Sequence, residues 1–300
     1  MKLFPRYAAL FAALVFGSSL ASSAQEGPRV VADILPVHSL VAQVMQGVGA
    51  PGLLLEAGSD PHSHAMRPSQ AELLERADVV ITIGPSLTPW LEKPLSALAS
   101  GAVLVSLLDI QGTTLLEYRG SHDHGHGHED HGDGVDPHAW LDPSNARVWL
   151  TAIAEVLADK DPTHGDIYRQ NAKAAREALS QLGVEWESLL TDIGLYGVHH
   201  DAFQYFEARF DLEPTFVVKE DDVHQPGPAR IAELRAEISH TPVSCVFVEP
   251  FVNRGLIETL LEGTEVQILE LDPIGARLEP GPELYSLVFH EMTQTMAKCR

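Results

Sequence analysis

The chain has 300 residues, of which 42 are acidic and 20 are basic, so its net charge is −22 at pH 7. A protein this negative repels the phosphates of nucleic acids and of anionic membranes, which argues against both as partners. Its field instead attracts cations.

The first 24 residues have the pattern of an export signal. Lys2 and Arg6 form a positive start, Tyr7–Phe16 is apolar, and Ser22-Ser23-Ala24 supplies small residues for cleavage. The apolar stretch is too short for a transmembrane helix, and no Cys follows the cleavage site. We expect residues 1–24 to be a signal peptide that is removed, leaving an exported, soluble protein without a lipid anchor.

Short apolar runs then alternate with segments of helical spacing, which is typical of α/β units with a mostly parallel sheet. The expected strands are Val30–Ile34, Leu53–Leu55, Val79–Ile83 and Val103–Leu107. The expected helices are Val37–Gln46, Ser69–Arg76, Leu87–Leu98 and Ser144–Ala158. Together they predict a first α/β lobe over residues 25–160.

Histidines gather in and around this lobe. Asp60-Pro61-His62 follows the second strand, and Asp136-Pro137-His138 opens a motif that ends at Pro143. Residues 120–134 are low in complexity, and we expect them to form a disordered loop that binds extra metal weakly, because chelation costs a flexible segment conformational entropy. A merely solvated polar loop is the alternative. The histidines of this loop are His122, His124, His126, His128 and His131.

A long helix is predicted next. Helical spacing extends over about 25 residues from Asp166 to Leu190. The residues that could share its apolar face are Ile167, Ala174, Leu179, Leu182, Trp186 and Leu189. At ~1.5 Å per residue the helix spans close to 40 Å, so we expect residues 161–192 to connect two lobes as a stiff strut.

A second α/β series follows and predicts a second lobe over residues 193–300. Its first strand leads into His199-His200-Asp201-Ala202-Phe203. The expected strands are Tyr196–Val198, Thr215–Val218, Val243–Val248 and Val266–Leu271. The expected helices are Ala202–Arg209, Ala229–Ile238, Val252–Leu260 and Glu283–Ala297.

The only cysteines are Cys245 and Cys299. In an exported chain two thiols more often pair than stay free, so a disulfide is the first expectation and two separate buried thiols are the alternative.

His62, His138 and His200 each lie just past a predicted strand or on its connecting loop. Open α/β sheets present their binding groups at that edge. Imidazole binds zinc through one ring nitrogen while a second group holds the other, so three dispersed histidines need a rigid fold to bring them together.

Several motifs, in this order, resemble the metal-binding cluster of ABC-importer substrate-binding proteins, and in particular its periplasmic zinc-binding members. The resemblance covers nearly the whole mature chain. It implies two α/β lobes joined by a long helix, Zn²⁺ in the cleft as the transported ligand, a Cys245–Cys299 disulfide and an inner-membrane ABC permease as partner. The segments that carry it are His62 with Arg67-Pro68-Ser69, Asp136–Pro143, His200–Phe203 with Tyr205-Phe206, Gln225-Pro226-Gly227, Val246–Pro250 and Leu271–Gly275.

Residue by residue, the family's three zinc-ligating histidines correspond to His62, His138 and His200. The fourth position stays open: Asp272 matches an acidic metal ligand of manganese-binding and some zinc-binding relatives, and water is its competitor. Some relatives have Glu before the first histidine, where this chain has Pro61. Three imidazoles favour zinc over manganese.

The neighbouring histidines receive a plainer interpretation. We expect His64 to support the site or merely adjoin it. We expect His199 to be a neighbour of the ligand His200 rather than a donor, because adjacent strand residues face opposite ways.

Two other functions compete, a zinc-dependent hydrolase and a His-rich metal buffer. Three histidines with an open fourth position also hold catalytic zinc, but no general base accompanies these motifs. In His290-Glu291-Met292-Thr293-Gln294 a Gln replaces the second histidine of a zinc-protease helix. A buffer would explain the histidine run but not the α/β series. We therefore expect a non-enzymatic, monomeric periplasmic carrier that delivers zinc to a permease, with other periplasmic zinc-binding proteins as further partners.

Overall fold

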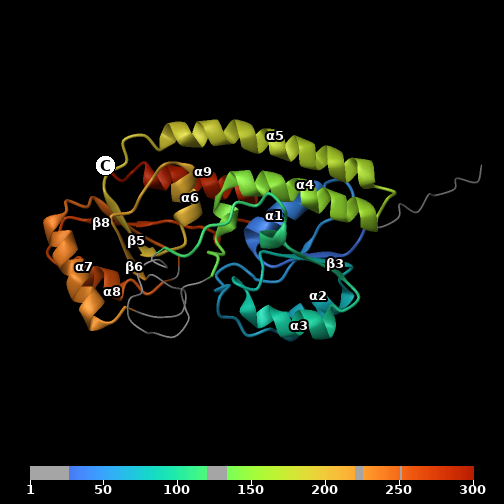
Figure 1. Ribbon diagram of the computed structural model, residues 1–300, viewed down its shortest axis with the longest axis horizontal. Coiled ribbons are helices and arrows are strands. Elements are labelled where there is room, and N and C mark those ends of the chain that lie inside the picture. The colour runs from blue at the N-terminus through green and yellow to red at the C-terminus, as the bar shows by residue number, and fades with distance from the viewer. Residues whose placement is uncertain (1–26, 120–133, 220–225, 251) are drawn as a thin grey trace, which may run out of the picture.

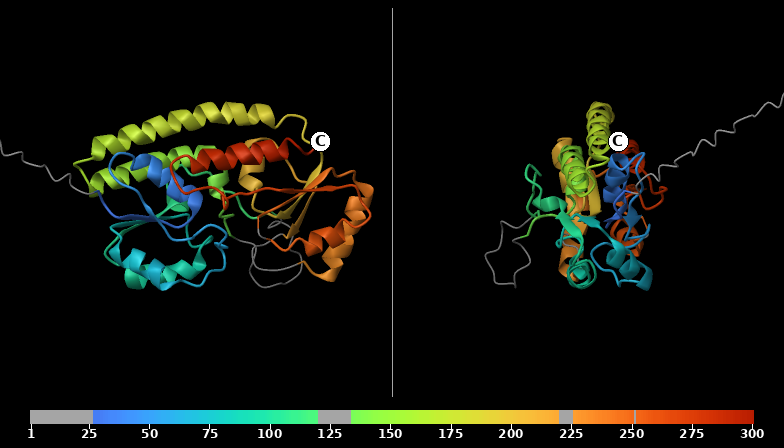
Figure 2. Two further views of the ribbon diagram at one scale, coloured as in Figure 1. Left: turned by 180° about the vertical axis from the view of Figure 1, so that it is seen from behind. Right: turned by 90° about the vertical axis from the view of Figure 1, so that its right-hand side faces the viewer.

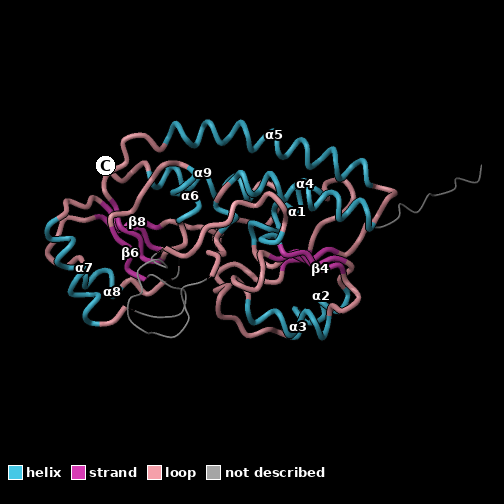
Figure 3. Tube along the Cα trace, in the orientation of Figure 1, coloured by secondary structure: helices cyan, strands magenta, loops and turns pink. Residues whose placement is uncertain are grey.

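The computed structural model describes residues 27–119, 134–219, 226–250 and 252–300. Two lobes lie side by side along the long axis of the molecule, each with a four-stranded sheet (Figure 1). The strands form two separate groups (Figure 3). The predicted signal peptide and all five histidines of the run before Asp136 lie outside the described residues.

The first lobe is built on a parallel sheet with strand order β2-β1-β3-β4. Its central strands consist of buried residues, because helices cover both faces of the sheet (Figure 1). The strands are β1 (Val30–Ala32), β2 (Gly52–Leu53), β3 (Val79–Thr82) and β4 (Val103–Ser106). The helices are α1 (Leu35–Val44), α2 (Pro68–Arg76), α3 (Glu92–Leu98) and α4 (Pro143–Lys160).

The second lobe repeats this arrangement in the order β6-β5-β7-β8, again all parallel. The chain passes from β5 to β6 on one side and then crosses back to β7 on the other side of β5. The strand order therefore reverses between β5 and β7, and their carboxyl ends border the crevice where open α/β sheets bind ligands. The strands are β5 (Tyr196–His200), β6 (Phe216–Lys219), β7 (Cys245–Val248) and β8 (Gln267–Glu270). The helices are α6 (Gln204–Arg209), α7 (Pro228–His240), α8 (Gly255–Leu260) and α9 (Leu284–Met296).

The long helix α5 (Gly165–Leu189) has 25 residues and runs over both lobes (Figures 1 and 2). The prediction of its buried face was partly wrong: Leu179 and Trp186 are buried, but Ile167 and Ala174 are exposed. Steps of three or four residues back from Leu179 lead to positions other than Ile167 and Ala174. The residues at these positions are small or aromatic, and they face the protein. The remaining buried members are Gly165, Tyr168, Ala172 and Ala175.

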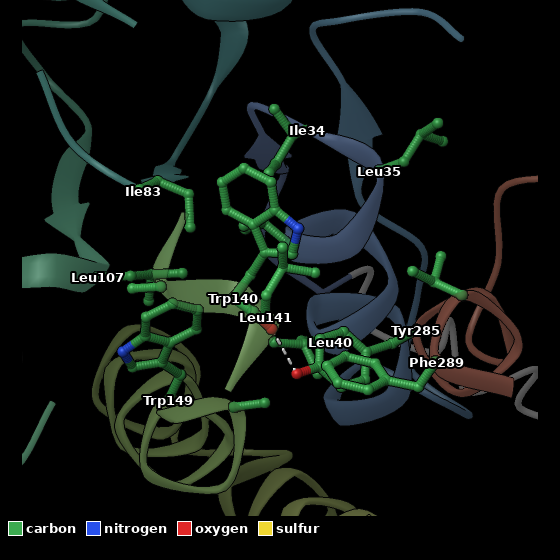
Figure 4. Packing of buried hydrophobic residues seen from close by; sticks show 14 of the residues in the cluster. Ile34, Leu35, Leu40, Ile83, Leu107, Trp140, Leu141, Trp149, Tyr285 and Phe289 are labelled. Atoms are coloured by element: carbon green, nitrogen blue, oxygen red, sulfur yellow. Dashed lines mark hydrogen bonds between the residues drawn. The ribbon is translucent and has the colours of Figure 1, made fainter. Parts of the chain in front are cut away.

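Besides α5, a second set of contacts connects the two lobes. Helix α9, from the end of the chain, packs against α1 of the first lobe and against α5. The Tyr285 hydroxyl donates to the Trp140 carbonyl over 2.6 Å (Figure 4). The Trp140 indole donates to the Pro273 carbonyl over 2.8 Å. Ser39 of α1 donates to the Pro282 carbonyl. These buried bonds fix the two lobes to each other near the crevice.

Every predicted strand and helix is present, with ends that differ by a few residues. Cys245 and Cys299 form a disulfide with Cα atoms 5.7 Å apart, so β7 is tied to the end of the chain. Among the described residues, no helix combines the length and apolar character needed to cross a membrane.

Candidate metal centre

Three histidines from distant parts of the chain converge between the lobes. His62, His138 and His200 each offer a ring nitrogen, and these atoms lie within 4.8 Å of one another. Their ring centroids are 5.2 to 5.9 Å apart. Nitrogens that share one zinc ion at ~2.0 Å lie roughly 3.3 Å apart, so small side-chain adjustments would bring all three onto a single ion.

His62 lies on the loop between β2 and α2, which local hydrogen bonds hold in shape. The Asp60 carboxylate accepts the His62 backbone N–H at 2.9 Å and the Ser63 hydroxyl at 2.7 Å. The Trp90 indole donates to the Pro61 carbonyl at 2.9 Å. His62 is the least buried of the three histidines, so this loop forms the outer side of the site.

His64 supports the same loop and is not one of the three converging histidines. Its Nε2 is 3.0 Å from Oε1 of Gln70, and its ring centroid is 4.9 Å from that of Trp90. Gln70 also accepts the Arg67 N–H and donates to the Leu54 carbonyl. His64 thus helps to fasten the His62 loop to the start of α2.

His138 is buried and oriented by Asp136. The same Asp136 oxygen lies 2.8 Å from Nδ1 of His138 and accepts its backbone N–H at 2.9 Å. Pro137 between them and the short helical turn that follows keep this arrangement compact. A carboxylate at Nδ1 fixes the tautomer that leaves Nε2 free to bind a metal.

His200 ends strand β5, and Glu249 directly follows β7. Both carboxylate oxygens of Glu249 are 3.1 Å from Nδ1 of His200. Burial works to raise the pKa of Glu249, but the neighbouring imidazoles of His200 and His199 outweigh it and hold that pKa below its usual range. Glu249 is therefore an anion that orients His200 from behind.

His199 departs from the strand-alternation prediction. It borders the same cavity as His200, and its Nδ1 lies 3.8 Å from the Glu249 carboxylate. His199 is still not one of the three converging histidines.

Asp272 follows β8 and lines the cavity, but it is not part of the cluster within 4.8 Å. One carboxylate oxygen accepts the N–H groups of Ile274 and Gly275, and the other accepts that of Ala276. Burial raises the pKa of Asp272, and these three N–H groups oppose the rise. Its carboxylate shapes the loop after β8 and faces the cavity from the second lobe.

The cavity around these residues has a volume of about 510 Å³ and is lined from both lobes. Residues 58–62, His138 and Trp140 border it on one side, and the ends of β5, β7 and β8 border it on the other. The five histidines of residues 122–131 lie outside the described residues, and the chain on either side of that segment is bridged by Glu117 and Val135.

Sequence reasoning found the three converging histidines but did not assign roles to Asp136 and Glu249. The signal was present in Asp136-Pro137-His138 and in the acidic residue after an apolar strand, Val248-Glu249-Pro250. Pairing Glu249 with His200 requires knowing that β5 and β7 are neighbours.

The chain is similar to known proteins over most of its length. The model of a family described as ZnuA, zinc-uptake complex component A periplasmic, matches residues 30–299. The high-affinity zinc uptake system protein ZnuA of Paracoccus denitrificans (strain Pd 1222) is 38% identical over 320 residues, which cover 98% of each chain. The protein of the same name from Brucella abortus (strain 2308) is 36% identical, covering 97% of this chain and 96% of the relative.

Solved structures share the fold. A crystal structure of ZnuA aligns with a TM-score of 0.79 at 21% identity and covers 91% of this chain and 99% of that chain. FpvC from Pseudomonas aeruginosa in complex with Mn²⁺ aligns with a TM-score of 0.78 at 21% identity, covering 92% and 98%. At these identities the likeness establishes the two-lobed architecture.

Proposed function

Since this chain belongs to the ZnuA family of periplasmic zinc-uptake proteins, we propose that it captures Zn²⁺ between its two lobes in the periplasm and delivers the ion to an inner-membrane ABC importer. The observation that carries this proposal is the convergence of His62, His138 and His200 at a cavity lined from both lobes. The ion is cargo, so the site must release it as well as hold it.

The three histidines would bind zinc as neutral imidazoles. Asp136 and Glu249 stand at Nδ1 of His138 and His200, so Nε2 of each ring is the nitrogen that would bind the metal. Because protons compete for the same nitrogens, zinc affinity should fall as the pH is lowered. Imidazole donors suit zinc, and geometry and availability rather than raw affinity must exclude copper.

For the fourth position we propose Asp272, with water as the competitor. Asp272 lines the cavity, and a carboxylate would offset part of the charge of the ion in a partly enclosed site. Its oxygens already accept backbone N–H groups, but each carboxylate oxygen has a second lone pair. Replacing Asp272 by Asn and finding zinc affinity unchanged would favour water.

We propose a carrier rather than a hydrolase. The carboxylates that border the cavity already have structural partners: Glu249 holds His200, Asp272 accepts backbone N–H groups and Asp60 holds its own loop. A general base needs a carboxylate within reach of a metal-bound water and available for its proton. Steady hydrolysis of an ester, amide or phosphate substrate by the zinc-loaded protein, lost in H138A, would overturn this proposal.

We also propose that His122, His124, His126, His128 and His131 bind further metal weakly, that the mature protein is a monomer, and that other periplasmic zinc-binding proteins exchange metal with it. Deletion of residues 120–134 should remove the weak zinc-binding events and keep the strongest one. Loss of the strongest event instead would favour the metal-buffer function.

Calorimetric zinc titration of the mature protein tests the central claim. The wild type should bind one ion tightly, and H138A should lose that event. His240→Ala is a matched control, because His240 is an exposed histidine on α7. Tight binding that persists in H138A would disprove the assignment.

Delivery is tested in cells. A strain without this protein should grow poorly only when zinc is scarce and should recover when zinc is added. Normal growth under chelation, in a strain without a second zinc importer, would count against transport.

A further inference from the structure

Arg119 pairs with two buried carboxylates, one of which directly follows His200 in the chain. Its Nη2 lies 3.2 Å from Oδ1 of Asp201 and 2.5 Å from Oε2 of Glu207. The two carboxylate side chains are only 5% and 3% exposed. One guanidinium nitrogen therefore bridges two buried acids, and Tyr196 donates to the other oxygen of Glu207.

This contact joins segments that are distant in the sequence. Arg119 belongs to the segment that leads out of the first lobe, whereas Asp201 follows β5 and Glu207 lies on α6. Neighbouring bonds fasten the same segment: Gln204 donates to the Glu117 carbonyl at 2.9 Å. The Tyr205 hydroxyl accepts from the Leu116 N–H and donates to the Asp136 carbonyl. Arg119 is thus held at a fixed position against the second lobe.

Asp201 carries the contact to the metal site, because it directly follows His200 in the chain. Its backbone N–H donates to the Lys219 carbonyl, which continues the pairing of β5 with β6. Its Oδ1 is buried and accepts no hydrogen bond from the described residues, and the ion pair with Arg119 offsets part of the cost of burying this carboxylate. A buried carboxylate that loses its cation must protonate or move, and movement here displaces His200.

We propose that Arg119 is a positioning residue for zinc binding: through Asp201 it fixes the turn after β5 and so the orientation of His200. This inference rests on the three-histidine site proposed above. Positioning and simple electrostatics predict opposite results. Loss of a positive charge near a cation site would by itself strengthen zinc binding, whereas loss of a positioning contact weakens it.

The first experiment compares zinc affinity, by competition with a chelator, in the wild type, R119Q and R119K. We expect R119Q to bind zinc about tenfold to a hundredfold more weakly at unchanged stoichiometry, the range found for outer partners of metal ligands. R119K keeps a cation that one nitrogen can place between the two acids, so its affinity should lie between the other two. Arg169→Gln is the control, since it breaks an exposed ion pair with Glu155 on the helical side of the molecule.

The electronic spectrum of the cobalt-substituted protein gives a second readout that stability alone does not move. R119Q should show altered d–d bands, which report a changed ligand geometry, while Arg169→Gln should match the wild type. If R119Q unfolds without metal, R119K serves for both measurements. Unchanged or tighter zinc binding with an unchanged cobalt spectrum would overturn the proposal.

A double-mutant cycle tests the route through Asp201. If Arg119 acts through that carboxylate, R119Q should have little further effect on affinity in a D201N background. Full additivity of the two changes would overturn this route. Failure of H138A to abolish tight binding would refute the three-histidine site itself, whereas loss in H138A with no effect of R119Q refutes only the role of Arg119.

Discussion

Nδ1 of His200 lies 3.1 Å from both carboxylate oxygens of Glu249, although the two residues are 49 positions apart. The contact exists because β5 and β7 are adjacent parallel strands whose carboxyl ends meet at one edge of the sheet. Asp136 does the same for His138 from two residues away. Two of the three converging imidazoles thus have an anion at Nδ1, which raises their basicity as ligands and fixes their tautomer.

The first prediction concerns this pair. E249Q removes the negative charge behind His200 but keeps the side-chain shape, so zinc affinity should fall about tenfold to a hundredfold while one ion per protein is still bound. Calorimetry or chelator competition measures the effect. Glu155→Gln, at an exposed ion pair on α4, is the control, and equal zinc affinities in E249Q and the wild type would show that Glu249 does not support the ligand.

Much of this organisation could be predicted from the sequence, and the exceptions share a cause. Apolar runs such as Val79–Ile83 indicated strands because a buried parallel strand needs apolar residues on both faces. His62, His138 and His200 stood out because each lies in a separate motif, just past a predicted strand or on its connecting loop. The partner of His200 did not, because Glu249 reaches that histidine only through the pairing of β5 with β7.

The buried face of α5 shows a second limit. Ile167 and Leu182 suggested one apolar face, yet the helix packs through Tyr168, Ala172 and Ala175. Alanines contribute little to a hydrophobic pattern, but they allow close approach of helix α4. The hydrophobic periodicity predicted the helix correctly, but part of the predicted buried face was displaced by one residue, as with Ile167 in place of Tyr168.

The second prediction concerns Asp33, a fully buried carboxylate at the end of β1. It accepts the N–H groups of Ile34 at 2.8 Å and Ile83 at 2.7 Å. Burial raises the pKa of Asp33 to about 7, against the opposing effect of these N–H groups. The folded protein therefore holds the proton more tightly than the unfolded chain, whose Asp titrates near ~3.9.

The sign of the effect follows from linkage. The contribution of Asp33 is fully present below the unfolded pKa and is lost as the pH rises through the folded pKa, so between about pH 4 and pH 7 the free energy of unfolding should decrease by up to roughly 4 kcal/mol. Urea denaturation at pH 5 and pH 8 measures the part of this decrease that lies above pH 5. D33N should show a smaller difference between the two pH values, though not none, because burial also raises the pKa of Glu207 to about 7. The same difference in D33N and wild type would contradict the assignment.

The third prediction concerns the Cys245–Cys299 disulfide, which closes a loop with a sequence separation of 54 residues. Replacing both cysteines by serine removes the link between positions 245 and 299, so the unfolded chain gains conformational entropy. The free energy of unfolding should therefore fall by about 4 kcal/mol in the chain-entropy model. Guanidinium denaturation measures this loss. Zinc stoichiometry should not change, because both cysteines lie away from the residues that line the cavity. A denaturation midpoint equal to that of the wild type would show that the bond contributes no stability.

The fourth prediction is that zinc changes the protein locally. Helix α5 spans both lobes, α9 packs on α1 and α5, and buried bonds such as Tyr285 to Trp140 join the lobes near the crevice. Large hinge rotation would break these contacts together, whereas the His62 loop and the turn after β5 can adjust while the lobes stay in place. Hydrogen exchange with and without zinc should therefore show the largest protection around residues 58–64 and 199–203, with little change in α4 and α5. H138A supplies the control, since added zinc should leave its exchange pattern nearly unchanged. Uniform protection across both lobes of the wild type would mean that α5 bends and that metal binding moves the two lobes relative to each other.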